Sequence, residues 1–368
     1  MKAKSLVVVG ICSCVGCACL VFAVVRPRLP NEPALRPEPV YQGTPLRVWA
    51  TELTKHGEFD LRPPDRAAKA LREMGPAAVP FLIEWLPKPS EPVTRLERLL
   101  SEVPVLGRLF RDAKRGPRSP VSSEAVVAAF RVLGPDARAA LPTLAKTLRT
   151  TRFSTRDYAA WHSASEAIPW IGSEAVPVML TVVTNLQGIH ERWVLIRQFG
   201  LLGSNGAPAI PALVVWTGDQ DPWVRLGAVS ALGEIAQQAE LVVPVLRVAA
   251  LTDPDALVRR DAAEALGSFG PGVIPDLIKA LHDSDWQVRS GAVGGLGKVA
   301  VDRPELVLPL LDQYLRDDNW IIRRSAAYAL GFSGSKAGYM MLMAATNISE
   351  IGDIIHQFRA TTDPEALK

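Results

Sequence analysis

Residues 219–233 read DQDPWVRLGAVSALG, and three later stretches repeat this pattern. The other copies read DPDALVRRDAAEALG from residue 253, DSDWQVRSGAVGGLG from residue 283 and DDNWIIRRSAAYALG from residue 317. The copies therefore start 34, 30 and 34 residues apart, and self-similarity at such a period is typical of stacked helical hairpins. The sequence predicts a repeat protein built from helix pairs.

Each copy carries the signals of a helix followed by a turn. Its third residue is an aspartate or asparagine that falls where a helix begins, and such a side chain predicts an N-cap. Apolar residues such as Val224, Ala228 and Leu232 recur at helical spacing, and the closing glycine predicts the end of the helix. A proline in the next apolar run predicts the start of the partner helix, at Pro244, Pro275 and Pro309.

A single helix pair cannot bury its own apolar stripe, so neighbouring pairs must stack into a curved rod with a concave face. Weaker copies precede residue 211, each marked by a glycine and then a proline: Gly75 and Pro80, Gly134 and Pro142, Gly172 and Pro177, Gly203 and Pro211. In three of these copies Val126, Ala164 and Leu195 occupy the place of the repeated arginine. We predict an all-α fold, a right-handed α-α superhelix of about eight helix pairs over residues 49–346, with an insertion at 88–120 and a C-terminal cap and tail at 347–368.

The first aspartate of each copy is followed six residues later by an arginine. Because stacking brings each turn against the turn of the next repeat, this spacing predicts a structural ladder of ion pairs. Its members are Asp219, Arg225, Asp253, Arg259, Asp283, Arg289, Asp317 and Arg323. A basic ladder that binds an anion is the alternative interpretation.

The N-terminal segment is apolar. Ser5 to Val25 contains no charged residue and is long enough to cross the ~30 Å hydrocarbon layer as a helix. We therefore predict a membrane anchor or signal at residues 1–25, inserted through residues 5–25, and a proline-rich spacer at 26–48. The flanking basic residues favour an N-terminus inside, which predicts a single-pass protein with its solenoid outside the cytoplasm. A cleaved secretory signal and a lipoprotein signal are the alternatives.

The composition argues against several classes of site. With 41 basic and 38 acidic residues the formal charge is +3, far from the excess of a duplex-DNA binder, so no nucleic acid is expected as a partner. All four cysteines lie between residues 12 and 19, so the chain beyond them has no cysteine metal site. Of the five histidines only His190 is followed by a glutamate, and we expect no metal, no cofactor and no small-molecule substrate.

The concave face offers the candidate binding residues. Its lining helices project polar and apolar side chains, and exposed tryptophans are good interface anchors. The partner-binding candidates are Trp223, Leu226, Arg260, Glu264, Trp286, Trp320, Arg324 and Tyr328. For the tryptophans the alternative is a structural role, in which each one covers a repeat junction.

The pattern over residues 211–335 resembles HEAT repeats, in particular the short bacterial kind also found in phycobilisome lyase subunits. Residues 40–49, VYQGTPLRVW, look like the entry sequence of membrane-anchored or secreted bacterial HEAT proteins with no established activity. The resemblance implies a non-catalytic scaffold that binds a protein or peptide on the concave face. It also implies two alternatives, a lyase-like or chaperone protein that acts on a client protein, and a metal-dependent HEAT-type hydroxylase.

Overall fold

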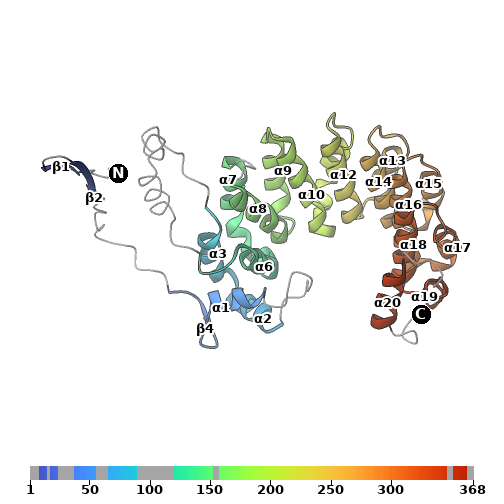
Figure 1. Cartoon of the computed structure of the whole chain (residues 1–368), viewed down its shortest axis with the longest axis horizontal. Helices are drawn as coiled ribbons and strands as arrows, with labels where there is room; N and C mark the ends of the chain where they lie inside the picture. Colours follow the sequence, from blue (N-terminus) through green and yellow to red (C-terminus); the bar gives the residue numbers. More distant parts are fainter. Residues whose placement is uncertain are drawn as a thin grey trace. The chain divides into compact units, whose positions relative to one another are not determined.

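A computed structural model describes residues 8–14, 17–23, 37–54, 65–88, 119–151, 157–345 and 351–362. The chain divides into two compact units, Met1–Pro39 and Val40–Lys368 (Figure 1). Most of the predicted insertion at residues 88–120, and the tail beyond residue 362, lie outside the described residues.

In the first unit, strands β1 (Val8–Cys14) and β2 (Cys17–Ala23) pair antiparallel, with Val8 opposite Ala23. The described part of residues 5–25 therefore does not show the predicted membrane-spanning helix. Valine, isoleucine and phenylalanine are frequent here and favour strands. Across the described ranges no single helix is both long and apolar enough to cross a membrane, and one pair bent by 92°, Ile189–Gln198 with Gly200–Trp216, meets that test only jointly.

The second unit opens with a short hairpin, β3 (Val40–Tyr41) and β4 (Thr44–Pro45), and continues as helices. The helices are α1 (Leu46–Glu52), α2 (Asp65–Met74), α3 (Val79–Trp85), α6 (Ser123–Leu133), α7 (Leu141–Thr150), α8 (Tyr158–Ala167), α9 (Ala175–Asn185), α10 (Ile189–Gln198), α11 (Ile210–Trp216), α12 (Pro222–Ile235), α13 (Ala239–Thr252), α14 (Ala256–Leu266), α15 (Ile274–Ala280), α16 (Trp286–Asp302), α17 (Pro304–Tyr314), α18 (Trp320–Phe332), α19 (Lys336–Ala344) and α20 (Gly352–Thr361).

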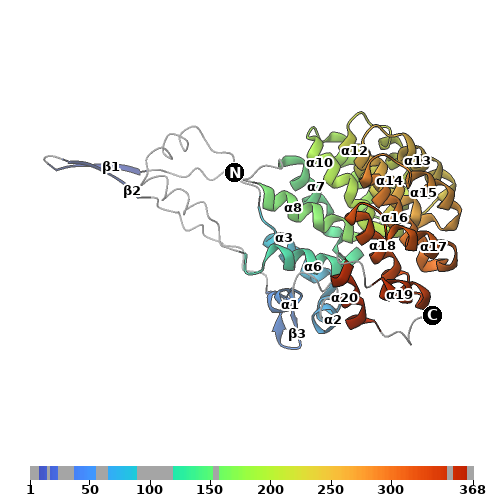
Figure 2. The ribbon, with the colours of Figure 1, turned by 45° about the vertical axis from the view of Figure 1, so that its right-hand side comes forward.

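These helices form two rows that follow the chain order. Helices α10, α12, α14, α16 and α18 contact one another in turn, while α11, α13 and α15 form the neighbouring row. Figures 1 and 2 show α14, α16 and α18 on the inner side of the curve of this unit and α13, α15 and α17 on its outer side. The predicted solenoid of stacked helix pairs is confirmed, with one continuous apolar core between the rows.

The repeated acidic or amide residues begin the inner helices as predicted. Asp221 accepts a hydrogen bond from the Trp223 amide at 2.8 Å, and Asn319 accepts one from the Ile321 amide at 2.9 Å. Asp255 and Asp285 cap α14 and α16 in the same way. The first aspartate of each copy adds a second bond within the turn, since Asp219 accepts from the Asp221 amide at 2.9 Å.

The repeated glycines confirm the prediction only in the second copy, where Gly267 ends α14. Helix α12 continues past Gly233 to Ile235, and α16 continues past Gly297 to Asp302, so these glycines do not end their helices. Instead they lie at helix contacts, where a Cβ on Gly233 would come within 2.5 Å of the Ala265 Cβ. Two of the predicted starts are also wrong, because Pro244 and Pro309 lie inside α13 and α17.

Candidate binding surface of the inner helix row

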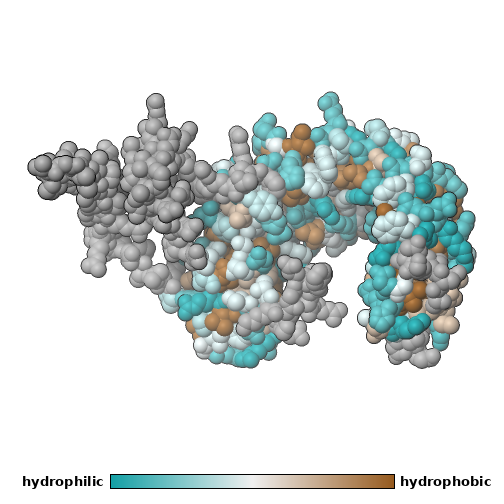
Figure 3. All heavy atoms as spheres, in the orientation of Figure 1, coloured by the Kyte–Doolittle hydropathy of each residue, from teal (hydrophilic) through white to brown (hydrophobic). Residues whose placement is uncertain are grey.

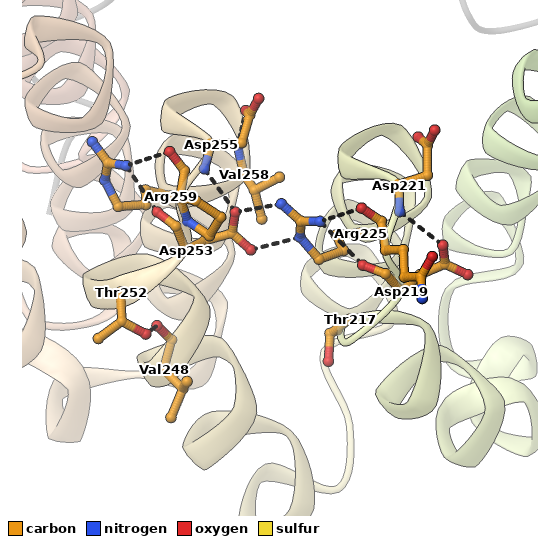
Figure 4. Close-up of polar contacts among 12 residues, drawn as sticks. Thr217, Asp219, Asp221, Arg225, Val248, Thr252, Asp253, Asp255, Val258 and Arg259 are labelled. Atoms are coloured by element: carbon orange, nitrogen blue, oxygen red, sulfur yellow. Dashed lines mark hydrogen bonds and ion pairs between the residues drawn. The ribbon is translucent and has the colours of Figure 1, made fainter.

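Two arginines of the predicted ladder tie adjacent repeats together. Arg225 donates from Nε and Nη2 to the two carboxylate oxygens of Asp253, both at 2.8 Å, and from Nη1 to the Asp219 carbonyl at 3.0 Å (Figure 4). Arg259 repeats the arrangement with Asp283 at 2.9 and 3.2 Å. Each guanidinium therefore closes its own turn and clamps the next one, in the bidentate geometry that gives the strongest hydrogen bonds to a carboxylate.

The burial and the pKa shifts of the ladder residues indicate a structural role and not an anion-binding site. The side chains of Arg225 and Asp253 are only 11% and 7% exposed, which leaves little room for an external anion. The hydrogen bond that Arg225 donates to Asp253 raises the pKa of Arg225, and the bond that Arg259 donates to Asp283 likewise raises the pKa of Arg259. Desolvation pushes the pKa of Asp283 upward, but hydrogen bonds from Arg259 and the Asp285 amide outweigh it and lower that pKa.

The other two ladder arginines hold their own turns. Arg289 donates to the Asp283 carbonyl at 3.0 Å, and Arg323 donates to the Asp317 carbonyl at 2.8 Å. Every arginine of the ladder thus lies across the loop that precedes its inner helix.

One further arginine belongs to the ladder. Arg192 donates from Nη2 to Asp219 at 3.1 Å, and it stands four residues after the N-cap Gly188 as Arg225 stands four after Asp221. The expectation that Leu195 occupies the arginine position is therefore wrong by three residues. The acidic pair that marks the later copies is replaced here by Leu186 and Gly188, so the signal for the register is missing.

The predicted tryptophans lie at the N-terminal ends of inner helices. Trp223, Trp286 and Trp320 are 47%, 37% and 53% exposed. Trp223 packs edge-on against Trp193 of α10, with ring centroids 5.1 Å apart, so it also covers the junction between α10 and α12. Trp193 was not among the predicted residues, because its position follows from the corrected register of Arg192.

The structure brings some of the predicted inner-face residues together, but it buries one of them, Leu226. Leu226 is 7% exposed and does not project into solvent, because α12 packs closely on α10 there, with Gly227 against Trp193. Arg260 and Glu264 of α14 and Tyr328 of α18, by contrast, line one groove across α16. Arg324 lies beside it, donating to Asp353 at 3.1 Å with its guanidinium 5.9 Å from the Tyr328 ring centroid.

This feature, the α14–α16–α18 groove, has a volume of about 400 Å³. Its lining consists of Arg260, Glu264, Ser290, Gly291, Gly294, Gly297, Lys298, Val301, Ser325, Tyr328, Ala329 and Phe332. All of these residues belong to α14, α16 and α18, the helices on the inner side of the curve in Figure 2. Figure 3 shows brown, hydrophobic residues in small separate patches among teal and white ones, which favours discrete anchor points over a broad apolar face.

The described residues offer no metal centre. Within them, no group of three or more histidine, cysteine, aspartate or glutamate side chains is placed to hold an ion. His190 contacts the Trp193 ring, with centroids 5.2 Å apart. No chemical step through a metal is therefore derived from these residues.

Comparison with known proteins identifies the repeat. A family model described as HEAT repeats matches residues 190–267, 243–331 and 274–350, which confirms the resemblance of the sequence pattern. A deoxyhypusine hydroxylase from Eremothecium gossypii is 39% identical over 82 residues, a match that spans 21% of this chain and 24% of that enzyme.

Two solved structures are similar to parts of this chain. The complex of CpcE and CpcF of phycocyanin lyase from Nostoc sp. PCC7120 is 18% identical, covers 60% of this chain and 94% of that chain, and has a TM-score of 0.38. The structure of Kap121p bound to Pho4p is 12% identical, covers 79% of this chain and 34% of that chain, and has a TM-score of 0.46. The chain thus spans about a third of the length of Kap121p.

Proposed function

Because a model of HEAT repeats matches residues 190–267, 243–331 and 274–350, we propose that this chain is a non-catalytic scaffold that binds a protein or an extended peptide on its inner helix row. The observation that carries this proposal is the α14–α16–α18 groove, which lies on helices of the inner row and combines charged and aromatic side chains. A stack of helix pairs presents an extended surface of this kind without any catalytic group.

The exposed side chains around the groove support a binding role. Phe332 is 62% exposed and Val301 is 59% exposed, although both belong to helices that bury most of their apolar residues. Large apolar side chains held on rigid helices are suitable anchors for a partner, because they lose little conformational freedom on binding. Trp286 and Trp320 extend the same row of helices with two more exposed aromatic rings.

A site-specific photo-crosslinker tests the proposal. p-Benzoylphenylalanine is placed at Tyr328, on the inner row, and in a parallel protein at Met340, which is 57% exposed on α19. We expect a discrete protein adduct from position 328 and none from position 340, and we expect Trp286→Ala with Trp320→Ala to weaken it. Adducts from position 340 alone would overturn the inner-row assignment.

A metal-dependent hydroxylase is the second candidate, favoured by the 82-residue match to an enzyme of that name. Such chemistry needs several histidine and carboxylate ligands around each metal ion, and the described residues do not group three of them. Elemental analysis of the purified full chain decides between the two, because iron bound in stoichiometric amounts would displace the scaffold proposal.

The location of the scaffold is a separate proposal, supported by composition alone. The uncharged stretch from Ser5 to Val25 would hold the chain at a membrane as a single-pass protein, with the solenoid outside the cytoplasm. Alkaline extraction of membranes tests it, since the full chain should stay in the pellet and a chain starting at residue 26 should be released.

A further inference from the structure

Helix α16 contains four glycines, and packing explains three of them. A Cβ on Gly291 would lie 2.3 Å from the Arg260 carbonyl oxygen, and one on Gly295 would lie 2.7 Å from the Ala263 carbonyl oxygen. A Cβ on Gly297 would lie 2.8 Å from the Ala329 Cβ. These glycines allow α16 to approach its neighbours on both sides.

Gly294 has no such explanation. The nearest atom to a Cβ at this position is Cγ of Glu264 at 3.4 Å. This distance is an ordinary van der Waals contact, and the side chain it involves is flexible. Alanine would therefore fit, and alanine stabilises a helix interior relative to glycine. The residue type at 294 follows neither from helix formation nor from helix packing, but Gly294 lines the α14–α16–α18 groove and keeps its floor low.

The two walls of the groove differ in chemistry. On α18, the Tyr328 and Phe332 rings stack with centroids 6.1 Å apart and planes inclined by 13°. On the opposite side, the charged lining residues are Arg260, Glu264 and Lys298, two cations and one carboxylate. Asp261, which pairs with Arg260, lies beside this second wall, so the groove offers an aromatic wall facing a wall of two cations that are each paired with a carboxylate.

The cations of the second wall keep donors available. Arg260 donates from Nε to Asp261 at 2.7 Å and pairs with the same carboxylate through Nη2, while its guanidinium carries five N–H groups. Lys298 pairs with Glu264 at 3.4 Å through one of three ammonium hydrogens, and both side chains remain partly exposed. A second carboxylate can bind here without breaking either pair.

The geometry points to one ligand chemistry: an extended peptide that places an aromatic side chain over Gly294, against Tyr328 and Phe332, and a neighbouring carboxylate at Lys298 and Arg260. A volume of about 400 Å³ holds such a side chain and its neighbours and is too small for a whole helix. This inference rests on the proposed scaffold function and names the partner of that surface.

The direct test is binding of defined peptides to the full chain. Fluorescein-labelled octapeptides in a glycine–serine background carry Trp and Asp separated by one to three residues, and matched peptides replace Trp by Ala or Asp by Lys. Fluorescence polarisation should show a Trp–Asp peptide binding at least about ten-fold tighter than either matched peptide, the effect of losing one anchor contact. Equal binding of all peptides, or no binding by any Trp–Asp peptide, overturns the inference.

Variants locate the binding. Gly294→Leu should fill the groove and weaken the Trp–Asp peptide about ten-fold or more, whereas Gly272→Leu, at an exposed turn with no atom within 4 Å, should leave binding unchanged. Lys298→Glu should reverse the preference toward the Trp–Lys peptide, and it tests the site even if the leucine variant unfolds. If the Gly294 and Gly272 variants bound the Trp–Asp peptide equally well, this groove would be excluded as the peptide-binding site.

The crosslinking experiment separates the two proposals. If peptides fail but position 328 still yields a specific adduct, the groove chemistry is wrong and the scaffold function stands. If position 328 yields no adduct either, the proposed function fails as well.

Discussion

The glycines that the sequence pattern aligns before and after residue 211 have different roles, although Gly270 downstream also turns the chain, with φ 82°. Upstream, Gly134 directly follows α6 and Gly172 directly follows the 3-10 turn Ile168–Ile171 after α8, with positive φ of 55° and 90°, so they turn the chain. Downstream, Gly233 and Gly267 lie where one inner helix touches the next, and a Cβ on Gly267 would come within 2.2 Å of the Gly295 carbonyl oxygen. A residue type that recurs at a fixed spacing therefore does not define one structural role.

The two regions also fill their junctions differently. The fully buried aromatic side chains among the described residues, Trp49, Phe130, Trp161 and Phe199, all lie upstream. Downstream junctions consist of alanine, valine, leucine and glycine, with the Arg225–Asp253 and Arg259–Asp283 pairs beside them. Large buried aromatic side chains stabilise the upstream region, whereas close contacts between helix backbones and ion pairs between repeats stabilise the downstream region.

The largest expected effect separates these two kinds of core. Trp161→Ala should lower the free energy of unfolding by about 3–5 kcal/mol, because the fully buried indole leaves a large cavity. Val288→Ala, at a fully buried position of α16, removes fewer atoms and should cost less. Urea denaturation of both variants measures the difference, and equal losses would contradict a core stabilised by bulk upstream.

The close contacts between downstream helices predict a loss of stability through overpacking, and not through a cavity. Gly267→Ala adds one methyl group against the α16 backbone and should destabilise by about 1–3 kcal/mol through overpacking. Gly272→Ala is the matched control, since its Cβ meets no atom within 4 Å. A Gly267 variant as stable as this control would show that the junction is looser than the structure indicates.

The turn glycines predict a somewhat smaller effect. At Gly134 the backbone has φ 55° and ψ −130°, a conformation that side chains disfavour, so Gly134→Ala should cost about 1–2 kcal/mol. Thermal unfolding checks the loss. Because the nearest atom to a Cβ here is the Trp170 carbonyl oxygen at 3.8 Å, strain and not a clash is the cause, and a neutral result would remove the distinction between the two glycine classes.

The sequence predicted the downstream region well, because there the acidic caps, the ladder arginines and the apolar stripe all agree in register. Helices α12, α14, α16 and α18 begin at the predicted caps, and two predicted ion pairs cross the junctions. At α10 the cap is a glycine, so Gly203 was matched with Gly233 although Gly200 stands eight residues after Arg192, the spacing of the later copies. The three-residue shift assigned the arginine position to Leu195, which is why Arg192 and the neighbouring Trp193 were not predicted.

The groove could be predicted only in part. Arg260, Glu264 and Tyr328 follow from the repeat register, because equivalent positions of successive inner helices face the same side. Lys298 and Phe332 could not be assigned, because the predicted helices ended before them at Gly297 and Gly331, whereas α16 and α18 run on. How deep the groove is depends on the distance between helices, which a sequence pattern does not contain.

The smallest expected effect concerns the ladder, and its pH dependence identifies it. The pKa of Asp283 lies below its ordinary value of 3.8 in the folded chain, so as the pH falls the unfolded state takes up the proton first. The stabilisation by Asp283 is therefore complete above about pH 4 and is lost as the pH falls below that value. Asp283→Asn should cost about 1 kcal/mol at pH 7, as expected for a partly exposed ion pair, and the difference from the unmodified chain should shrink toward pH 3.

Urea midpoints at pH 7, 5 and 3 measure this dependence, and Asp302→Asn, at the exposed end of α16, serves as the control for the loss of one negative charge. The ladder variant should change the pH profile and the control should not. If both variants gave the same profile, the effect would be one of net charge, and the Arg259–Asp283 pair would not distinguish the downstream junctions from the upstream ones.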